Sequence, residues 1–233
     1  MKPFHFKQFS IEQDQCAMKV TLDACVLGAF CDVADSSHIL DIGAGTGLLS
    51  LMVAQRTGAK ITAIELDPLA AAQAAKNVAN SSFSDRISVI QGDVLQNHWQ
   101  QSFDRIVCNP PFFSDHLKGP NNARNQARHN DGLSFDDLLA VCHQVLTQDG
   151  QAWFILPCHE FPEFIAAAKN KGFLLANRLT LKSRTEKPAH REIFSLVKTY
   201  CNEPVHQELV IHDQHNQYSE HFKRLLKPYY LKL

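Results

Sequence analysis

The sequence predicts an α/β fold: a mostly parallel, seven-stranded sheet with helices on both faces and an antiparallel hairpin at one edge. Two patterns lead to this prediction. From Ile39 onward, short apolar runs alternate with segments of helical period, which is typical of parallel strands joined by right-handed crossovers. Residues 173–200 then hold two strand-like runs with only a short, basic, proline-containing link between them, and such neighbours should pair antiparallel.

The expected elements follow one another along the chain. The strands are residues 38–43, 60–67, 86–93, 103–111, 151–157, 173–183 and 191–200. The helices are residues 48–57, 68–81, 135–148 and 160–172. Pro68 suits the first turn of the second helix, Ser134 is a favourable N-cap for the third, and Gly150 follows the end of that helix.

The composition indicates a soluble protein of one domain. With 45% hydrophobic and 20% charged residues, the chain can bury a sizeable core, and no stretch approaches the roughly 20 apolar residues of a membrane helix. The seven cysteines form no C-x-x-C pair and the twelve histidines are scattered, so neither disulfides nor a metal site are predicted. No signal-peptide core is visible, and we expect a cytoplasmic protein without a membrane partner. The single domain is expected to comprise an N-terminal segment (1–37), a core (38–200) and a C-terminal extension (201–233).

A glycine-rich loop lies between the first expected strand and the first expected helix. Gly43, Gly45 and Gly47 allow a tight turn there and the close approach of a ligand. The loop fails the dinucleotide pattern, because Leu48 stands where G-x-G-x-x-G needs a glycine, and no Lys-Ser/Thr pair makes it a P-loop. For the loop taken alone, the alternative that its glycines serve only helix–strand packing stays open.

Three acidic residues accompany the ends of the first three expected strands: Asp41, Glu65 and Asp93. Ligands of open α/β sheets bind outside the carboxyl ends of the strands, where an acid can accept hydrogen bonds from ribose hydroxyls. An acid-lined pocket without a phosphate cradle disfavours NAD and ATP and suits a positively charged ribonucleoside such as S-adenosylmethionine. One such acid alone could be a helix cap, as Asp67 before Pro68 is expected to be.

The fourth expected strand stops on Asn109-Pro110-Pro111-Phe112, where two prolines bar both a helix and a continued central strand. The Asn109 side-chain oxygen and the Pro110 carbonyl can accept both hydrogens of a planar amino group. Phe112 can stack on a flipped-out base. Standing alone, the motif would favour a simpler interpretation, a Pro-Pro turn followed by a core phenylalanine.

Taken in order, "LDIGAGTG", "IELD", "QGD" and "NPPF" resemble the class I S-adenosylmethionine-dependent methyltransferases that methylate planar exocyclic nitrogens. The resemblance implies a Rossmann-like fold, with S-adenosylmethionine as cofactor and S-adenosylhomocysteine as product. It implies catalytic roles for Asn109, Pro110, Pro111 and Phe112. It also implies cofactor contacts from Asp41, Gly43, Gly45, Gly47, Glu65, Asp93 and Val94.

The flanks of the chain are similar to one family in particular. "FKQF", "CAMKV" and "LGA" near the amino end, and "NQYSE" and "YYL" near the carboxyl end, resemble the tRNA adenine-N6 methyltransferases. That family modifies the adenine immediately after the anticodon of a valine tRNA. It implies that the N-terminal segment packs beside the methionine end of the cofactor, with Lys19 and Thr21 near its carboxylate, although Thr21 is also a fair N-cap. Phe112 departs from the tyrosine of many such enzymes, so guanine stays open as the target base.

Three other functions stay open at this point: a ribosomal RNA guanine-N2 methyltransferase, a protein glutamine-N5 methyltransferase and a non-catalytic RNA-binding protein. Basic candidates for RNA contact lie in the polar stretch Ser114–Asp131, which is expected to form a lid, and around the link between the last two strands. They are Arg124, Arg128, Lys182, Arg184, Lys187 and Arg191. Charge alone favours solvated loops at these positions. We expect a monomer or a weak dimer that binds tRNA.

Overall fold

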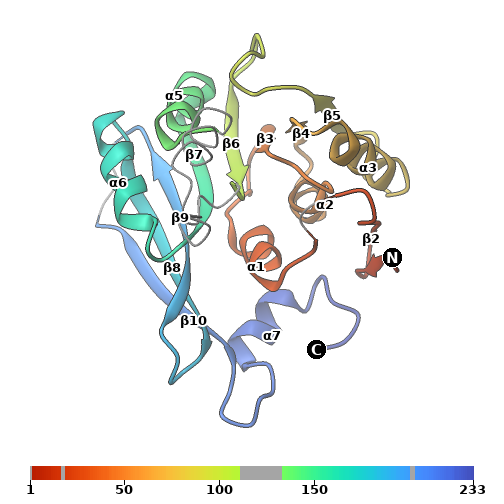
Figure 1. Cartoon of the computed structure of the whole chain (residues 1–233), viewed down its shortest axis with the longest axis vertical. Helices are drawn as coiled ribbons and strands as arrows, with labels where there is room; N and C mark the ends of the chain where they lie inside the picture. Colours follow the sequence, from red (N-terminus) through yellow and green to blue (C-terminus); the bar gives the residue numbers. More distant parts are fainter. Residues whose placement is uncertain (1, 17–18, 111–132, 200–202) are drawn as a thin grey trace, which may run out of the picture.

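A computed structural model describes residues 2–16, 19–110, 133–199 and 203–233, and its main feature is an eight-stranded sheet (Figure 1). From one edge to the other the strands are β10 (Val205–His212), β8 (Leu174–Arg184), β9 (Ala189–Val197), β7 (Leu146–Pro157), β6 (Phe103–Cys108), β3 (His38–Ile42), β4 (Lys60–Glu65) and β5 (Ile87–Gln91). Strand β9 is antiparallel to β7 and β8, and the other neighbouring pairs of this sheet are parallel.

The expected fold class is confirmed: the sheet is mostly parallel, holds an antiparallel hairpin and is flanked by helices. The expected count of seven strands is wrong for the described part of the chain, because β10 adds an eighth strand parallel to β8. The hairpin of β8 and β9 therefore lies one strand inside the edge. Sequence analysis missed β10 because only Leu209 and Ile211 of this strand are buried, a weak apolar alternation typical of an edge strand.

Helices cover both faces of the sheet. One face carries α1 (Leu22–Phe30), α2 (Leu48–Ala54), α3 (Pro68–Ala79) and α7 (Glu220–Leu226), and the other carries α5 (Phe135–Val145) and α6 (Phe161–Asn170). Alternation along β3 shows the division, since Ile39 packs into the first core cluster while Leu40 and Ile42 pack into the second. In the ranges that the structure describes, no helix is long and apolar enough to cross a membrane.

The three N-caps that the sequence predicts are present. The side chains of Thr21, Asp67 and Ser134 each accept a hydrogen bond from the backbone N–H three residues later, at 3.2, 2.7 and 3.1 Å. Pro68 occupies the first turn of α3 as expected. These caps fix where α1, α3 and α5 begin, and α3 lies against the glycine-rich loop at Gly47.

Several predicted boundaries are wrong: the helix expected at 48–57 ends at Ala54, the strand expected at 103–111 ends at Cys108, and the helix expected at 135–148 is also shorter. Helix α5 ends at Val145 instead of continuing to residue 148, and Gly150 does not cap it. The chain passes directly into β7 at Leu146, whose backbone pairs with Phe103 at the start of β6. Pairing with β6 supplies the backbone hydrogen bonds that a further helical turn would have provided. Residues 146–148 are therefore part of β7 and not of α5.

The two ends of the chain come together beside α7 (Figure 1). A short ladder of β1 (Phe4–His5) and β2 (Ser10–Ile11) opens the chain. Phe6 forms an antiparallel bridge with Tyr230, and both rings belong to the core cluster that also contains α1 and α2. The terminal segments are therefore part of the folded core.

Candidate active site

The glycine-rich loop between β3 and α2 uses its three glycines in two different ways. Gly43, Gly45 and Gly47 all have positive φ angles, +70°, +55° and +80°, which side-chain-bearing residues rarely adopt. A Cβ atom on Gly43 or Gly45 would meet no atom within 4 Å among the described residues, whereas one on Gly47 would lie 3.5 Å from the Cβ of Ala74. The first two glycines therefore border open space at the carboxyl edge of the sheet. At Gly47 a side chain would make an ordinary contact with α3, so the positive φ angle is what favours glycine there.

Asp41 lies beneath this loop and is fully buried. One carboxylate oxygen, Oδ2, accepts hydrogen bonds from the Ser50 backbone N–H at 3.0 Å and from the Ser50 hydroxyl at 2.6 Å. The other oxygen, Oδ1, is buried and has no hydrogen-bond partner among the described residues. Burial raises the pKa of Asp41 to about 7, although the two Ser50 bonds oppose the shift. Asp41 thus holds the start of α2, and its second carboxylate oxygen is a buried acceptor without a partner in the described part of the chain.

Glu65, at the end of β4, braces the same loop. Its Oε2 accepts from the Gly45 N–H at 2.7 Å and its Oε1 from the Asp67 N–H at 3.0 Å. Each carboxylate oxygen can accept a second hydrogen bond, and the side chain is partly exposed, so ribose hydroxyls can still donate to it. Glu65 therefore both shapes the loop and offers acceptors at the sheet edge.

Asp93 stands beside Glu65, because the N–H of Gly92 donates to the Glu65 carbonyl at 2.9 Å. The Asp93 carboxylate accepts from the Leu95 N–H at 2.9 Å and from the Gln96 side chain at 3.0 Å. Val94 differs from its neighbour: its side chain is buried in the core cluster under β5 and β6. Asp93 thus presents a polar side chain at the edge, whereas the Val94 side chain packs inward.

Three exposed leucines near these acids were not predicted from the sequence. Leu66 and Leu69 follow Glu65 at the start of α3 and are 61% and 59% exposed, and Leu95 after β5 is 45% exposed. Large apolar side chains so exposed beside these polar groups suit the flat face of a nucleobase. The only sequence feature that could have indicated this apolar surface is a leucine directly after the acid that ends a strand. Leucines are also common where helices begin, so this feature is not specific.

The expected amine-binding motif begins where β6 ends. Cys108 is the partner of Ile42 on β3, so Asn109 follows directly beside the first glycine of the loop. The Oδ1 atom of Asn109 is buried and has no hydrogen-bond partner among the described residues. Leaving a buried acceptor unsatisfied costs about 1–3 kcal/mol, which is explicable where a substrate donor completes it. Pro110 is buried, and the remaining members of the motif, Pro111 and Phe112, lie outside the described residues.

The N-terminal segment is attached to the glycine-rich loop through α3. The Asn77 side chain accepts from the Glu12 N–H and donates to the carbonyls of Glu12 and Thr46, each at 2.9 Å. Lys19 and Thr21 follow on this segment and are exposed, and the Thr21 hydroxyl caps α1 as described above. The Asn77 side chain thus links the segment to the loop, and the placement of Lys19 and Thr21 near a cofactor stays a prediction.

The basic residues around the β8–β9 link lie at the carboxyl edge, because β8 runs in the same direction as β6 and β7. Three of these four residues already have partners. Lys182 pairs with Glu208 at 2.7 Å, the Arg184 guanidinium donates to Asn216 at 2.7 Å, and Arg191 pairs with Asp23 at 3.3 Å. Lys187, in the turn itself, is exposed. Arg124 and Arg128 lie outside the described residues, as does the whole stretch Ser114–Asp131 that was expected to form a lid.

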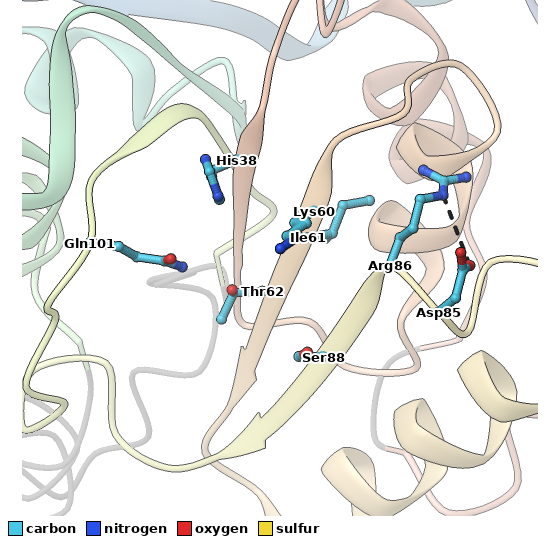
Figure 2. A pocket seen from close by; sticks show the side chains of 8 residues that line it. All are labelled: His38, Lys60, Ile61, Thr62, Asp85, Arg86, Ser88 and Gln101. Atoms are coloured by element: carbon cyan, nitrogen blue, oxygen red, sulfur yellow. Dashed lines mark ion pairs between the residues drawn. The ribbon is translucent and has the colours of Figure 1, made fainter.

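A hollow of about 320 Å³ lies at the opposite edge of the sheet and is separate from these residues (Figure 2). Figure 2 shows its side chains at the amino ends of β3, β4 and β5, including His38, Lys60 and Arg86. The Arg86 guanidinium donates to the carbonyls of Thr57 and Ala54, at 2.6 and 3.1 Å, so it holds the chain together there. This hollow therefore belongs to the scaffold. In the described ranges no three His, Cys, Asp or Glu side chains are grouped as metal ligands.

The chain is similar to known proteins in both sequence and fold. A family model described as "Methyltransferase small domain" matches residues 23–161. Relatives named tRNA1(Val) (adenine(37)-N6)-methyltransferase include one from Vibrio campbellii, 41% identical over 100% of this chain and 97% of its own length. Another, from Dyadobacter fermentans, is 43% identical over 98% of this chain and 97% of its own length. A solved structure titled as a predicted O-methyltransferase from Agrobacterium tumefaciens shares the fold with a TM-score of 0.68, at 22% identity over 88% of this chain and 96% of that one.

Proposed function

The chain belongs to the family of tRNA1(Val) (adenine(37)-N6)-methyltransferases, and we propose that it methylates N6 of adenine 37, the base after the anticodon, in valine tRNA. The observation that carries the proposal is the tip of β6. There the buried acceptor of Asn109 lacks a partner among the described residues and lies beside the open glycine-rich loop. We further propose that the protein acts in the cytoplasm, as a monomer or a weak dimer.

The residues at the carboxyl edge fit S-adenosylmethionine, a positively charged nucleoside. Gly43 and Gly45 leave room for it, Glu65 and Asp93 offer acceptors for its hydroxyl and amino groups, and the unpartnered oxygen of Asp41 offers a third. When bound, this cofactor supplies a methyl group activated by a sulfonium. Leu66, Leu69 and Leu95 would then flank its base, and Lys19 and Thr21 are proposed to lie near its carboxylate.

The chain's own contribution to the reaction is to hold the amine. The lone pair of an aromatic amino group is delocalised into the ring, which makes that nitrogen a poor nucleophile. The Asn109 oxygen and the Pro110 carbonyl can accept both N–H hydrogens, which favours the pyramidal nitrogen and directs its lone pair away from the two acceptors. Orientation of this kind can contribute roughly 7–11 kcal/mol to lowering a barrier. The methylated ammonium is acidic, so its proton can leave to water without a strong base.

The prolines and the following phenylalanine complete the proposed binding mode. Pro110 has no N–H and ends the strand ladder, and its carbonyl is proposed to face the pocket. Phe112 is proposed to stack on the flipped base, a contact of about 1–3 kcal/mol per base. Arg124, Arg128, Lys182, Arg184, Lys187 and Arg191 are proposed to contact tRNA phosphates. Three of the hairpin cations would then exchange or share the partners they have in this structure.

The proposed function is tested by methyl transfer to a defined RNA. The purified protein is incubated with labelled S-adenosylmethionine and an unmodified valine tRNA transcript carrying adenine at position 37, and the product nucleosides are identified. A transcript with guanine 37 is the matched control. N6-methyladenosine in the first RNA and no label in the second is the expected result. N2-methylguanosine in either RNA, or label only in protein, would overturn the substrate assignment.

A further inference from the structure

Two buried amide side chains stand among the alanines of α3. Gln73 and Asn77 are only 4% and 1% exposed, although both are strongly polar. They lie four residues apart, so they occupy the same face of the helix. Alanine at both positions would suit a buried helix face better, because a buried amide is tolerated only where its polar atoms have partners. The partners of these two amides therefore indicate what the side chains do.

Both amides hold residues 12–15 of the N-terminal segment, which we call the strap. The Gln73 side chain accepts a hydrogen bond from the Gln15 N–H at 2.9 Å. The Asn77 side chain accepts from the Glu12 N–H and donates to the Glu12 carbonyl, both at 2.9 Å. All three bonds join a side chain of α3 to the backbone of the strap. Helix α3 thus fixes the path of the strap independently of the strap's own side chains.

Asn77 also holds the glycine-rich loop. Its amide donates a second hydrogen bond to the Thr46 carbonyl at 2.9 Å, between Gly45 and Gly47. The N–H of Gly45, one residue earlier, donates to Glu65 as described above. Two successive loop residues are therefore fixed, one by the end of β4 and one by α3. Because Asn77 bonds to both the strap and the loop, a movement of either element changes the hydrogen bonds available to the other.

The strap also sets where the chain enters α1. The Gln13 side chain accepts from the Val20 N–H at 2.9 Å. Val20 immediately precedes Thr21, whose hydroxyl caps α1. Lys19 and Thr21 are the two residues proposed above to lie near the carboxylate of the cofactor. Displacing the strap would therefore displace the groups expected at that end of the cofactor.

We propose that Gln73 and Asn77 are positioning residues for the cofactor: they couple the strap to the glycine-rich loop, so that S-adenosylmethionine binds most tightly when the strap is in place. This inference rests on the proposed function. Both side chains act through the backbone groups that they hold, and neither is proposed to touch the cofactor. Such coupling is reciprocal, so a cofactor that binds more tightly when the strap is in place stabilises the strap by the same factor.

The coupling is tested with two variants and two matched controls. Q73M removes an acceptor from the strap and leaves the loop untouched, whereas N77L keeps the shape of the side chain and removes its bonds to both elements. K76Q is the first control, because Lys76 forms an exposed ion pair with Glu12 of the strap, and such a pair contributes little. V78A is the second control. Val78 packs in the core from the same helix, so its truncation destabilises α3 without removing a polar group.

Two measurements are made on each protein. Hydrogen exchange of the Glu12 and Gln15 amides is followed without ligand and with saturating S-adenosylmethionine, and cofactor affinity is measured by calorimetry. Without ligand, Q73M should speed exchange at Gln15, and N77L should speed it at Glu12, because each amide loses its acceptor. In the wild type, the cofactor should slow exchange of both amides about fivefold or more.

Cofactor affinity separates positioning from general destabilisation. Q73M and N77L should each bind S-adenosylmethionine about fivefold or more weakly, with the KM for tRNA unchanged. K76Q and V78A should keep cofactor affinity within about twofold of wild type, although V78A melts at a lower temperature. If N77L does not fold, Q73M alone decides, because it leaves the loop untouched.

Unchanged cofactor affinity in Q73M, or strap amides that the cofactor does not protect in the wild type, would overturn this inference. An affinity loss in V78A as large as that in Q73M would also overturn it, because destabilisation of α3 would then explain both. In each of these cases the proposed function stands as long as the wild type forms N6-methyladenosine. A wild-type protein that binds no S-adenosylmethionine, or forms no N6-methyladenosine, would instead count against the proposed function itself.

Discussion

Replacing Asp41 with asparagine should stabilise the fold while weakening the site. Asp41 is fully buried, and burial raises its pKa from 3.8 to about 7. Below pH 3.8 the carboxyl group is protonated in both the folded and the unfolded chain, so it does not lower the free energy of unfolding there. As the pH rises from 3.8 to 7, the unfolded chain loses this proton first, and the free energy of unfolding falls.

The size of the effect follows from the shift. About three pKa units at 1.36 kcal/mol each give roughly 4 kcal/mol of lost stability above pH 7, and about 2 kcal/mol at pH 5. Asparagine has the same shape, and its amide oxygen can accept both hydrogen bonds that Asp41 Oδ2 accepts from Ser50. D41N should therefore be more stable than the wild type by a few kcal/mol at pH 8 and by less at pH 5.

Urea unfolding of both proteins at the two pH values measures this difference, and calorimetry measures the affinity for S-adenosylmethionine. The variant should bind the cofactor at least about tenfold more weakly, because an amide N–H₂ replaces the free acceptor and the negative charge is lost. Because both proteins share the other titrating groups, these cancel in the comparison. If D41N were less stable than the wild type at pH 8, or if its advantage did not shrink at pH 5, the raised pKa of the buried Asp41 carboxyl group would be refuted.

Three further predictions concern the loop, the sheet edge and the hairpin. G45A places a side chain at φ +55° and into the open space of the cofactor site, so it should cost about 1–2 kcal/mol of stability and reduce cofactor affinity, as thermal unfolding and calorimetry would show. Equal affinity for wild type and variant would mean that Gly45 does not border the ligand. E65Q keeps an acceptor for the Gly45 N–H but loses the charge, and should weaken cofactor binding about tenfold with little change in the melting temperature; unchanged affinity would argue against a ribose contact. K187E should raise the KM for tRNA severalfold and more at low salt, whereas K182Q should have a smaller effect because Lys182 already pairs with Glu208. The opposite ranking would show that the paired cation is the one that binds RNA.

The sequence predicted the architecture because its signals were local and repeated. The caps at Thr21, Asp67 and Ser134 lie next to clear apolar periodicity, and the structure confirms them. Strand β10 escaped prediction because its pairing with β8 depends on a neighbour that the local sequence does not specify. The end of α5 at Val145 was missed for the same reason, since pairing with β6 overrides a helix-compatible sequence.

At the site, the sequence predicted which types of residue are present. It did not predict which structural role each of them has. Three glycines in one loop look alike in the sequence, yet Gly47 packs on Ala74 while Gly43 and Gly45 face open space. Among the basic hairpin residues, the pairing of Arg191 with Asp23 joins β9 to α1, a contact between distant parts of the chain. Which polar group is occupied and which is free depends on such tertiary contacts.

The central claim is that the tip of β6 holds the amino group that is methylated. It is tested most directly with N109A, in a single-turnover transfer to valine tRNA and a cofactor-binding measurement on the same preparation. Because the Asn109 acceptor is buried and has no partner in the described part of the chain, its removal should leave cofactor affinity within about threefold of wild type. The rate of transfer should fall by about a hundredfold to a thousandfold. Transfer within tenfold of the wild-type rate would contradict the claim.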